Sequence, residues 1–171
     1  MITIDGGTGI ILNNGVEVAS PKQFDEWRMS ADQDLSNTET LTNWERTDSN
    51  FDVQGSGMTH SSGVFTFPTT GKYQVNSIMC GRRVNTDQEY VGNMMQLSTN
   101  SGSSYVVAAA AWANCDSSNA HFVNSISRII DVTNVSTFRL YIRTNSANDV
   151  RYFGETDGNR CTIQFIRLCG T

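Results

Sequence analysis

The fold is decided by residues 62–75, which read Ser-Gly-Val-Phe-Thr-Phe-Pro-Thr-Thr-Gly-Lys-Tyr-Gln-Val. The β-branched and aromatic residues at 64–67 predict a strand. Pro68 has no backbone N–H to give to a sheet and ends that strand, and Gly71 permits a tight turn into a second strand that carries Tyr73 and Val75. Two strands joined by one corner indicate an antiparallel all-β fold.

The rest of the chain repeats this pattern. From Leu41 onward, strands are separated by turns rich in Asn, Asp, Ser and Gly, and no segment has helical periodicity. This spacing is typical of an antiparallel sandwich or jelly roll. The chain of 171 residues, with 38% hydrophobic and 17% charged residues, suits one such domain with an appendage. The predicted strands are 41–47, 58–60, 64–67, 72–82, 90–98, 105–113, 122–131, 137–144 and 161–168.

The first 40 residues have a different character. Asn14–Gly15 between apolar flanks is a strong hairpin signal. Because an isolated hairpin is only marginally stable in water, we expect this arm to pair with copies of itself or to dock on a partner. We therefore divide the chain into an N-terminal arm and linker, residues 1–40, and a jelly-roll domain, residues 41–171. The expected anchoring residues of the arm are Ile2, Ile4, Ile10, Ile11, Leu12, Val16 and Val18.

Two interpretations fit the residues that follow the arm. Ser20, Pro21 and Gln23 have the form of a helix capping box, which predicts a two-turn helix carrying Phe24 and Trp27 on one side. The alternative is an extended first strand. Residues 32–40 are polar and acidic, which indicates a linker or an exposed loop.

The formal charge of −5 is unevenly distributed. Residues 1–70 hold ten acids against three bases, and residues 71–171 hold seven acids against nine bases, nearly all of them Arg. Arg is favoured where a guanidinium pairs at a partly desolvated surface, so these residues indicate either a protein interface or an anionic glycan site. The alternative is ordinary strand surfaces with local acid partners. The acidic balance disfavours nucleic-acid binding.

No leader or membrane segment is recognisable in the sequence. The start lacks a basic residue ahead of an apolar core, and the most apolar stretch, 105–113, is far too short to span a bilayer. We expect a protein that is made and assembled in the cytoplasm and that does not insert into a membrane. The four cysteines have no zinc-ligand spacing and are expected to be free thiols in a reducing compartment.

Motifs for catalysis are missing. His60 and His121 are the only histidines, and neither has metal-ligand spacing or a neighbouring nucleophile motif. The glycines at 6–9 lack the Lys-Ser/Thr pair of a phosphate loop. Acidic residues in the predicted loops could converge on a calcium ion, although no EF-hand pattern is present. We expect no catalytic residue, no cofactor and no metal site.

Two features bear on packing and association. The aromatic residues Tyr105, Trp112, Tyr152 and Phe153 lie near strand ends, where they either complete the core or line a ligand groove. In the last strand, apolar side chains occupy both faces. Burial of both faces is what a subunit interface would produce, although a loop folded over the strand would do the same.

The pattern Gly-x-Phe-x-x-Pro-x-x-Gly-x-Tyr at residues 63–73 resembles the second and third strands of complement globular head and tumour necrosis factor-like jelly rolls. The resemblance covers about residues 41–168 and implies a homotrimeric binding or structural module. Met58 stands where those domains carry an aromatic residue, and no collagen-like stalk precedes the domain. The expected trimer interface includes Tyr73, Val75, Phe122, Ile163, Phe165, Ile166 and Leu168.

The start Ile-Thr-Ile-Asp-Gly-Gly-Thr-Gly-Ile at residues 2–10, joined to such a jelly roll, resembles virion proteins of marine and cyanobacterial tailed phages. This resemblance implies a capsid decoration protein or a short fibre protein, located in the virion and held to the capsid or tail by its arm. The alternative is the receptor-binding tip of a tail fibre that recognises a host-surface glycan.

Overall fold

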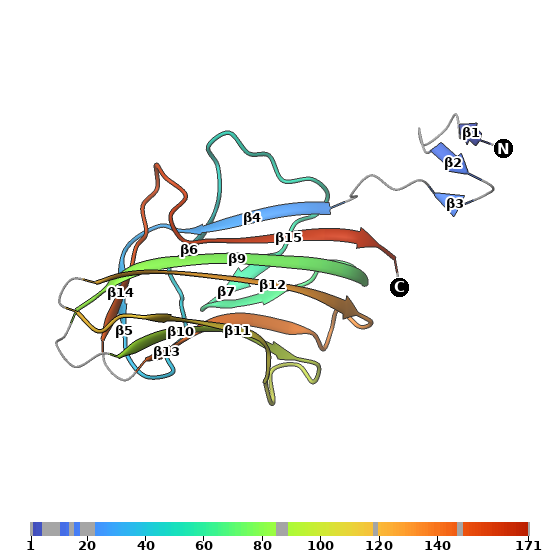
Figure 1. Cartoon of the computed structure of the whole chain (residues 1–171). Coiled ribbons are helices and arrows are strands. Elements are labelled where there is room, and N and C mark those ends of the chain that lie inside the picture. Colours follow the sequence, from blue (N-terminus) through green and yellow to red (C-terminus); the bar gives the residue numbers. More distant parts are fainter. Residues whose placement is uncertain are drawn as a thin grey trace.

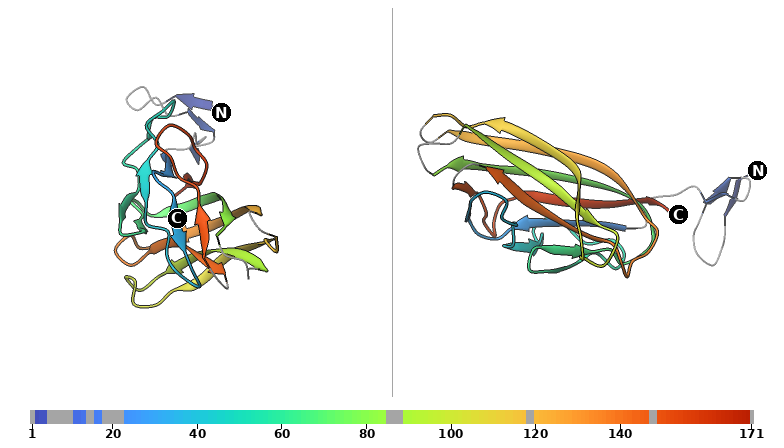
Figure 2. Two further views of the ribbon diagram at one scale, coloured as in Figure 1. Left: turned by 90° about the vertical axis from the view of Figure 1, so that its left-hand side faces the viewer. Right: turned by 90° about the horizontal axis from the view of Figure 1, so that it is seen from below.

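The computed structural model describes residues 2–4, 11–13, 16–17, 23–84, 89–117, 120–146 and 149–170. These residues form strands and turns, with no helix among them. Two antiparallel sheets pack face to face as a sandwich (Figures 1 and 2). The prediction of an all-β antiparallel jelly roll is confirmed. The described residues contain no helix that could cross a membrane.

The first sheet has the order β6-β4-β15-β9-β12, in which β12 is the edge strand. Its strands are β6 (Trp44–Arg46), β4 (Gln23–Met29), β15 (Thr162–Cys169), β9 (Gly71–Arg83) and β12 (His121–Val132). Beyond β15, the same side of β9 pairs with β14 (Val150–Tyr152), which pairs in turn with β5 (Gln33–Leu35).

The second sheet has the order β7-β8-β13-β10-β11, in which β11 is the edge strand. Its strands are β7 (Thr59–Ser61), β8 (Val64–Thr66), β13 (Arg139–Ser146), β10 (Tyr90–Ser98) and β11 (Val106–Asn114). Consecutive strands repeatedly cross between the two sheets, and only β7–β8 and β10–β11 are joined as neighbours within this sheet. That connectivity makes the sandwich a jelly roll.

All nine predicted strands are present, with bounds shifted by at most a few residues. The corner between the two strands of residues 62–75 has the expected form: β8 ends before Pro68, and Gly71 begins β9 with a φ of 143°. A Cβ atom at Gly71 would lie 2.4 Å from the backbone oxygen of Cys169, so only glycine fits where β9 meets the end of β15.

The jelly-roll domain begins earlier in the chain than the predicted boundary at Leu41. Residues 23–29 form β4, which lies between β15 and β6, so the jelly roll begins at Gln23 rather than at Leu41, and the helix interpretation is wrong. The buried side chains of Asp25, Trp27 and Met29 alternate along this strand, and its backbone pairs on both sides. The predicted linker at 32–40 also belongs to the sandwich, because it contains β5 and continues beside β13 through the bond from the Leu41 amide to the Ile142 carbonyl.

The core lies between the two sheets and is aromatic at its centre. Phe65 of the second sheet contacts Phe165 of the first, with ring centroids 5.2 Å apart. Phe67 packs on Phe165 and on Tyr73, and Trp44 and Trp27 close the same end of the core around Phe65. Because these contacts join β4, β6, β8, β9 and β15, the aromatic centre holds the two sheets together.

The arm forms a separate three-stranded sheet of β1 (Ile2–Ile4), β2 (Ile11–Asn13) and β3 (Val16–Glu17). Asn13 pairs with Val16, which leaves a two-residue connection at Asn14–Gly15 and confirms the hairpin. None of these strands pairs with a described strand of the sandwich. Five expected anchoring residues, Ile2, Ile4, Ile11, Leu12 and Val16, lie in this sheet, whereas Ile10 and Val18 lie outside the described residues.

Candidate interaction surface

The edge strand β12 presents apolar side chains on both of its faces. Phe122, Ile126 and Ile130 point inward and are buried, whereas Val123 and Ile129 point outward and are 66% and 58% exposed. On the neighbouring strand β9, Ile78 is also exposed on the outward face, opposite Ser125. Exposed large apolar side chains on one sheet face mark a contact surface.

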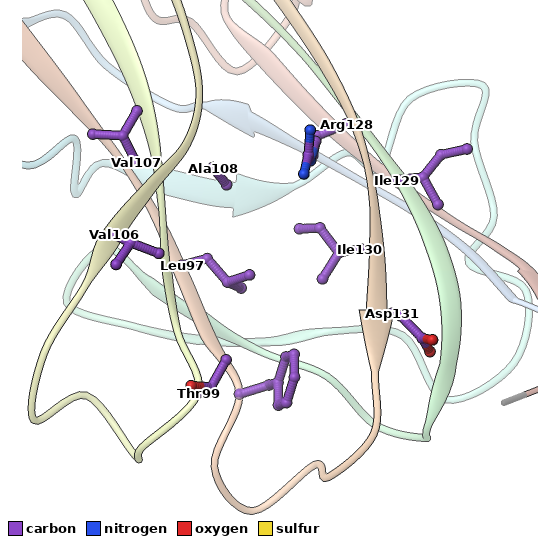
Figure 3. A pocket seen from close by; sticks show the side chains of 10 residues that line it. Leu97, Thr99, Val106, Val107, Ala108, Arg128, Ile129, Ile130 and Asp131 are labelled. Carbon is purple, nitrogen blue, oxygen red and sulfur yellow. The ribbon is translucent and has the colours of Figure 1, made fainter.

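A cleft of about 350 Å³ opens beside this face, at the edge of the sandwich where β11 and β12 end their sheets (Figure 3). Leu97, Ile130 and Phe138 line its apolar interior. Figure 3 shows Arg128 and Ile130 pointing into the cleft from β12, whereas Ile129 projects from the other side of that strand. The cleft is therefore the open edge of the core, reached from the side.

The rim of the cleft on β11 is formed by Val106 and Val107, which are strongly exposed. The outward side chains of the first sheet add further exposed apolar residues near the β11–β12 edge, on both sides of Ser127 and Asn76. We call these residues together the edge patch, which consists of Ile78, Val106, Val107, Val123 and Ile129.

Arg128 and Asp131 are the charged residues of the cleft lining. Neither forms an ion pair with another described residue. Because Arg128 is exposed, its guanidinium remains available to an acceptor on a partner that docks at the cleft.

A polar row crosses the outward face of the first sheet. The Gln164 amide donates to Glu26 at 2.6 Å, and the Ser127 hydroxyl donates to Asn76 at 2.8 Å. Gln164 pairs with both Glu26 and Asn76 in the sheet, so these four residues lie side by side across β4, β15, β9 and β12. The outward face thus carries exposed apolar side chains and a hydrogen-bonded row of polar side chains. Such a mixed surface suits a specific protein contact better than a purely apolar surface does.

Five of the seven expected interface residues do not lie on this surface. The side chains of Tyr73, Val75, Phe122, Ile163 and Phe165 are buried in the core of the chain itself, so they have no area left for a neighbouring chain, and that part of the prediction is wrong. Their strand positions face inward, since alternation places successive side chains on opposite faces. Ile166 is half-buried opposite outward-facing Gln74, and Leu168 is exposed.

The residues of the edge patch had a signal in the sequence. Val106–Val107 and Ile129–Ile130 are adjacent apolar pairs within strands. Because neighbouring strand residues point to opposite faces, such a pair always places one apolar side chain outside the core. The same argument applies to the last strand, in which apolar side chains occupy both faces.

The four aromatic residues near strand ends have different environments. Tyr152 is fully buried and belongs to the core, and this burial raises the pKa of its hydroxyl. The hydroxyl donates a hydrogen bond to Thr144 Oγ1 and accepts one from the Asn93 amide. Phe153 packs on His121, and Tyr105 packs edge-to-face on Tyr141. Trp112 alone among the four is mostly exposed.

Seven of the ten arginines divide into two groups. Arg28, Arg46, Arg151 and Arg160 pair with nearby acids, as the ordinary strand-surface interpretation predicts. Arg128, Arg139 and Arg143 form no ion pair with a described residue. The second group lies at the β11–β12 cleft and on the outward face of the second sheet, so partner contacts are expected there.

The cysteines are all free. Cys115 and Cys161 are buried, Cys80 is half-buried and Cys169 is exposed. The sulfur atoms of Cys80 and Cys161 lie 3.9 Å apart, and the hydrogen bond from the Cys161 thiol lowers the pKa of Cys80 to about 7. That proximity between strands could not be read from the sequence spacing.

No group of three or more His, Cys, Asp or Glu side chains within the described ranges is arranged to hold a metal ion. Asp87, one of the acids considered for calcium, lies outside those ranges. His60 and His121 are each packed against aromatic rings, and His60 Nε2 accepts a hydrogen bond from the Gly63 amide. The absence of an enzymatic function stays a prediction.

His60 gives the fold an expected pH dependence. Burial against Trp27 and Phe65 lowers its pKa below the value of about 6.5 in the unfolded chain. Below about pH 6.5 the unfolded state then binds the proton first, so stability is expected to fall as the pH falls through this range. Urea unfolding of the wild type and of His60→Gln from pH 7.5 to 5 tests this, and equal pH slopes would contradict it.

No protein-family model matches the sequence, and no curated protein matches it. Solved structures do match the coordinates. An Eiger TNF from S. frugiperda aligns with a TM-score of 0.66 and 14% identity over 89% of this chain and 96% of that one. The chain has a tumour necrosis factor-like jelly-roll fold. Murine APRIL at pH 5.0 aligns with the TNF-like jelly roll at a TM-score of 0.66 and 11% identity, over 85% of this chain and 98% of that one. At such identities the likeness concerns the fold.

Proposed function

We propose that this protein is a non-enzymatic structural component of a tailed-phage virion, a homotrimeric capsid decoration or short fibre protein held by its N-terminal arm. The observation that carries the proposal is the separate sheet β1–β3, which makes no strand pair with the jelly roll among the described residues. A small sheet of this size buries little surface by itself, so it gains its stability from a partner.

The edge patch supports self-association. It joins two different surfaces, the rim of the β11–β12 cleft and the outward face of the first sheet. When the rim of one copy packs on the outward face of the next, the contact is head-to-tail, and it forms a closed ring when the rotation from copy to copy divides the full turn. The family resemblance favours three copies in that ring.

The arm supports attachment to another virion protein. The free edges of β1 and β3 expose unpaired backbone groups that can add to the edge of a partner's sheet. Backbone pairing of this kind needs little side-chain complementarity, which agrees with an arm made mainly of Ile, Val, Gly and Thr. The jelly roll would then project outward from the particle.

Deleting residues 1–22 is expected to abolish attachment to the particle while leaving the jelly roll folded and assembled. The deletion ends before β4, because β4 is an integral strand of the first sheet. The measurement is co-sedimentation of the purified variant and of the full chain with particles of the phage that encodes it, prepared without this protein.

The control for this deletion is a full-length chain in which Trp112, on the jelly roll, is changed to Ala. This variant is expected to co-sediment like the wild type. Undiminished co-sedimentation of the deletion variant would refute the anchoring role of the arm.

A further inference from the structure

The outward face of the second sheet carries a feature that the assembly does not use. Trp112 of β11 is 55% exposed, although tryptophan side chains are usually covered in folded proteins. Its strand β11 is the edge of the second sheet and pairs with β10, which separates it from β13 (Figure 1). The other two tryptophans, Trp27 and Trp44, are buried in the core.

The indole of Trp112 lies in a defined position over Gly92, which we call its seat. In the register of the sheet, Gly92 lies between Trp112 on one side and Asn145 on the other. A Cβ atom at Gly92 would lie 2.5 Å from Trp112 Nε1 and 3.2 Å from Asn145 Cβ. The indole therefore extends across the glycine toward Asn145, and glycine is required beneath it.

Polar groups surround this ring without being used by the fold. The Asn145 side chain makes no hydrogen bond to another described residue. Two residues away on the same face of β13, the Arg143 guanidinium contacts Met94 Sδ at 3.4 Å, and its Nε has no partner. Arg143 also has no carboxylate partner among the described residues, so a charge-assisted donor stands beside the exposed ring.

The residues around the indole ring leave its outer face uncovered. Ala110 lies opposite Met94, next to the Trp112 row, and leaves the indole open on that side. Tyr90, two residues before Gly92 on the same face of β10, is partly exposed. The face thus offers a ring-sized apolar area with a second aromatic beside it, rather than the broad apolar area that a protein partner needs.

We propose that this face binds an acidic saccharide. The C–H face of one pyranose ring packs on the Trp112 indole, since flat aromatic faces attract such polarised C–H groups. Asn145 donates to and accepts from the ring hydroxyls, and Arg143 pairs with the sugar carboxylate. Tyr90 contacts the neighbouring sugar residue. The unpaired guanidinium is the reason to expect an acidic sugar rather than a neutral one.

The test is calorimetric titration of the full-length protein with three acidic probes, namely oligogalacturonate, hyaluronan fragments and sialyllactose, and with neutral malto-oligosaccharide. At least one acidic probe is expected to bind with a Kd below about 10 mM and more tightly than the neutral sugar. Trp112→Ala should weaken that binding about tenfold or more, and Arg143→Gln should reduce the preference for the acidic sugar.

Two further variants make the test specific. Gly92→Ala keeps the indole but displaces it from its seat, so it should also weaken binding. Val53→Ala removes an exposed apolar side chain beside β4, away from this face and from the edge patch, and should leave the affinity unchanged. The proposal is overturned if no acidic probe binds, if acidic and neutral sugars bind equally, or if Trp112→Ala leaves the affinity unchanged.

A change in oligomeric mass with Trp112→Ala would also overturn the proposal, because it would assign the indole to a contact between chains. The site does not depend on the arm or on the edge patch. Its failure would therefore leave the particle attachment and the mass of the assembly as they are predicted above.

Discussion

Replacing Asp25 by Ala is expected to lower the free energy of unfolding by about 3–5 kcal/mol, because it removes a fully buried carboxylate and leaves several donors, one of them an arginine, without an acceptor. The Asp25 carboxylate is fully buried in β4. It accepts hydrogen bonds from Trp27 Nε1 at 2.9 Å, from Arg46 Nε at 2.9 Å and from the backbone amide of Met58. These contacts tie β4 to β6 and to the start of β7.

Asp34 provides the matched control for this variant. Its carboxylate also pairs with an arginine, through two 2.7 Å bonds from Arg151, but the two side chains are 46% and 34% exposed. Solvent screens such a pair, so Asp34→Ala should cost less than about 1 kcal/mol. Urea unfolding of both variants at pH 7 measures the difference. Equal losses would show that burial of the Asp25 cluster does not govern its contribution.

Replacing Ile129 by Asp is expected to convert the proposed homotrimer into monomers without unfolding the jelly roll. In a single chain, Ile129 is more exposed than buried, so a carboxylate there disturbs the fold by only about 0.5 kcal/mol. In the proposed ring, the same position is covered by a neighbouring copy, and an unpaired charge would be desolvated at each of three contacts. Light scattering coupled to chromatography gives the mass.

The control for this change is Trp112→Asp, which introduces the same charge at a similarly exposed apolar residue on the other sheet. It is expected to leave the mass unchanged. If Ile129→Asp keeps the wild-type mass while far-ultraviolet circular dichroism shows a folded chain, Ile129 does not lie in the interface, and the edge patch is not the contact surface.

The sequence was most informative where strand alternation is undisturbed. In residues 138–143, Phe138, Leu140 and Ile142 are buried while the intervening side chains are partly exposed, in line with the alternation of apolar and polar residues in the sequence. Residues 90–98 match the predicted strand at both ends. When one face of a strand is apolar and the other is polar, the sequence predicts which side chains point into the core, because the apolar ones face inward.

The sequence left β4 undecided between a helix and an extended strand, and the structure shows the strand, in which polar residues occupy buried positions. Asp25 and Arg28 are both almost fully buried, and their charges are met by Arg46, Glu45 and Asp48 from residues about twenty positions away. The alternation of apolar residues alone therefore does not decide that this segment is a strand. Tertiary pairing supplies the information that a local window lacks.

The candidate sites were predictable only in part. The hairpin of the arm followed from Asn14–Gly15 alone, because the turn residues specify it. The edge patch depends on which strand ends each sheet, and the seat of Trp112 depends on Gly92 being its partner in the register. Sheet order and register arise from long-range pairing, which one sequence does not display.

The central claim is that the jelly roll assembles as a homotrimer and leaves the arm free for attachment. The most direct test is the solution mass of the full chain and of residues 23–171, measured by light scattering coupled to chromatography. The account predicts three chains for both proteins, which for the full protein is three times the chain mass of 18.9 kDa. Monomers of both would contradict it, and a trimeric full chain with a monomeric 23–171 fragment would assign the assembly to the arm instead.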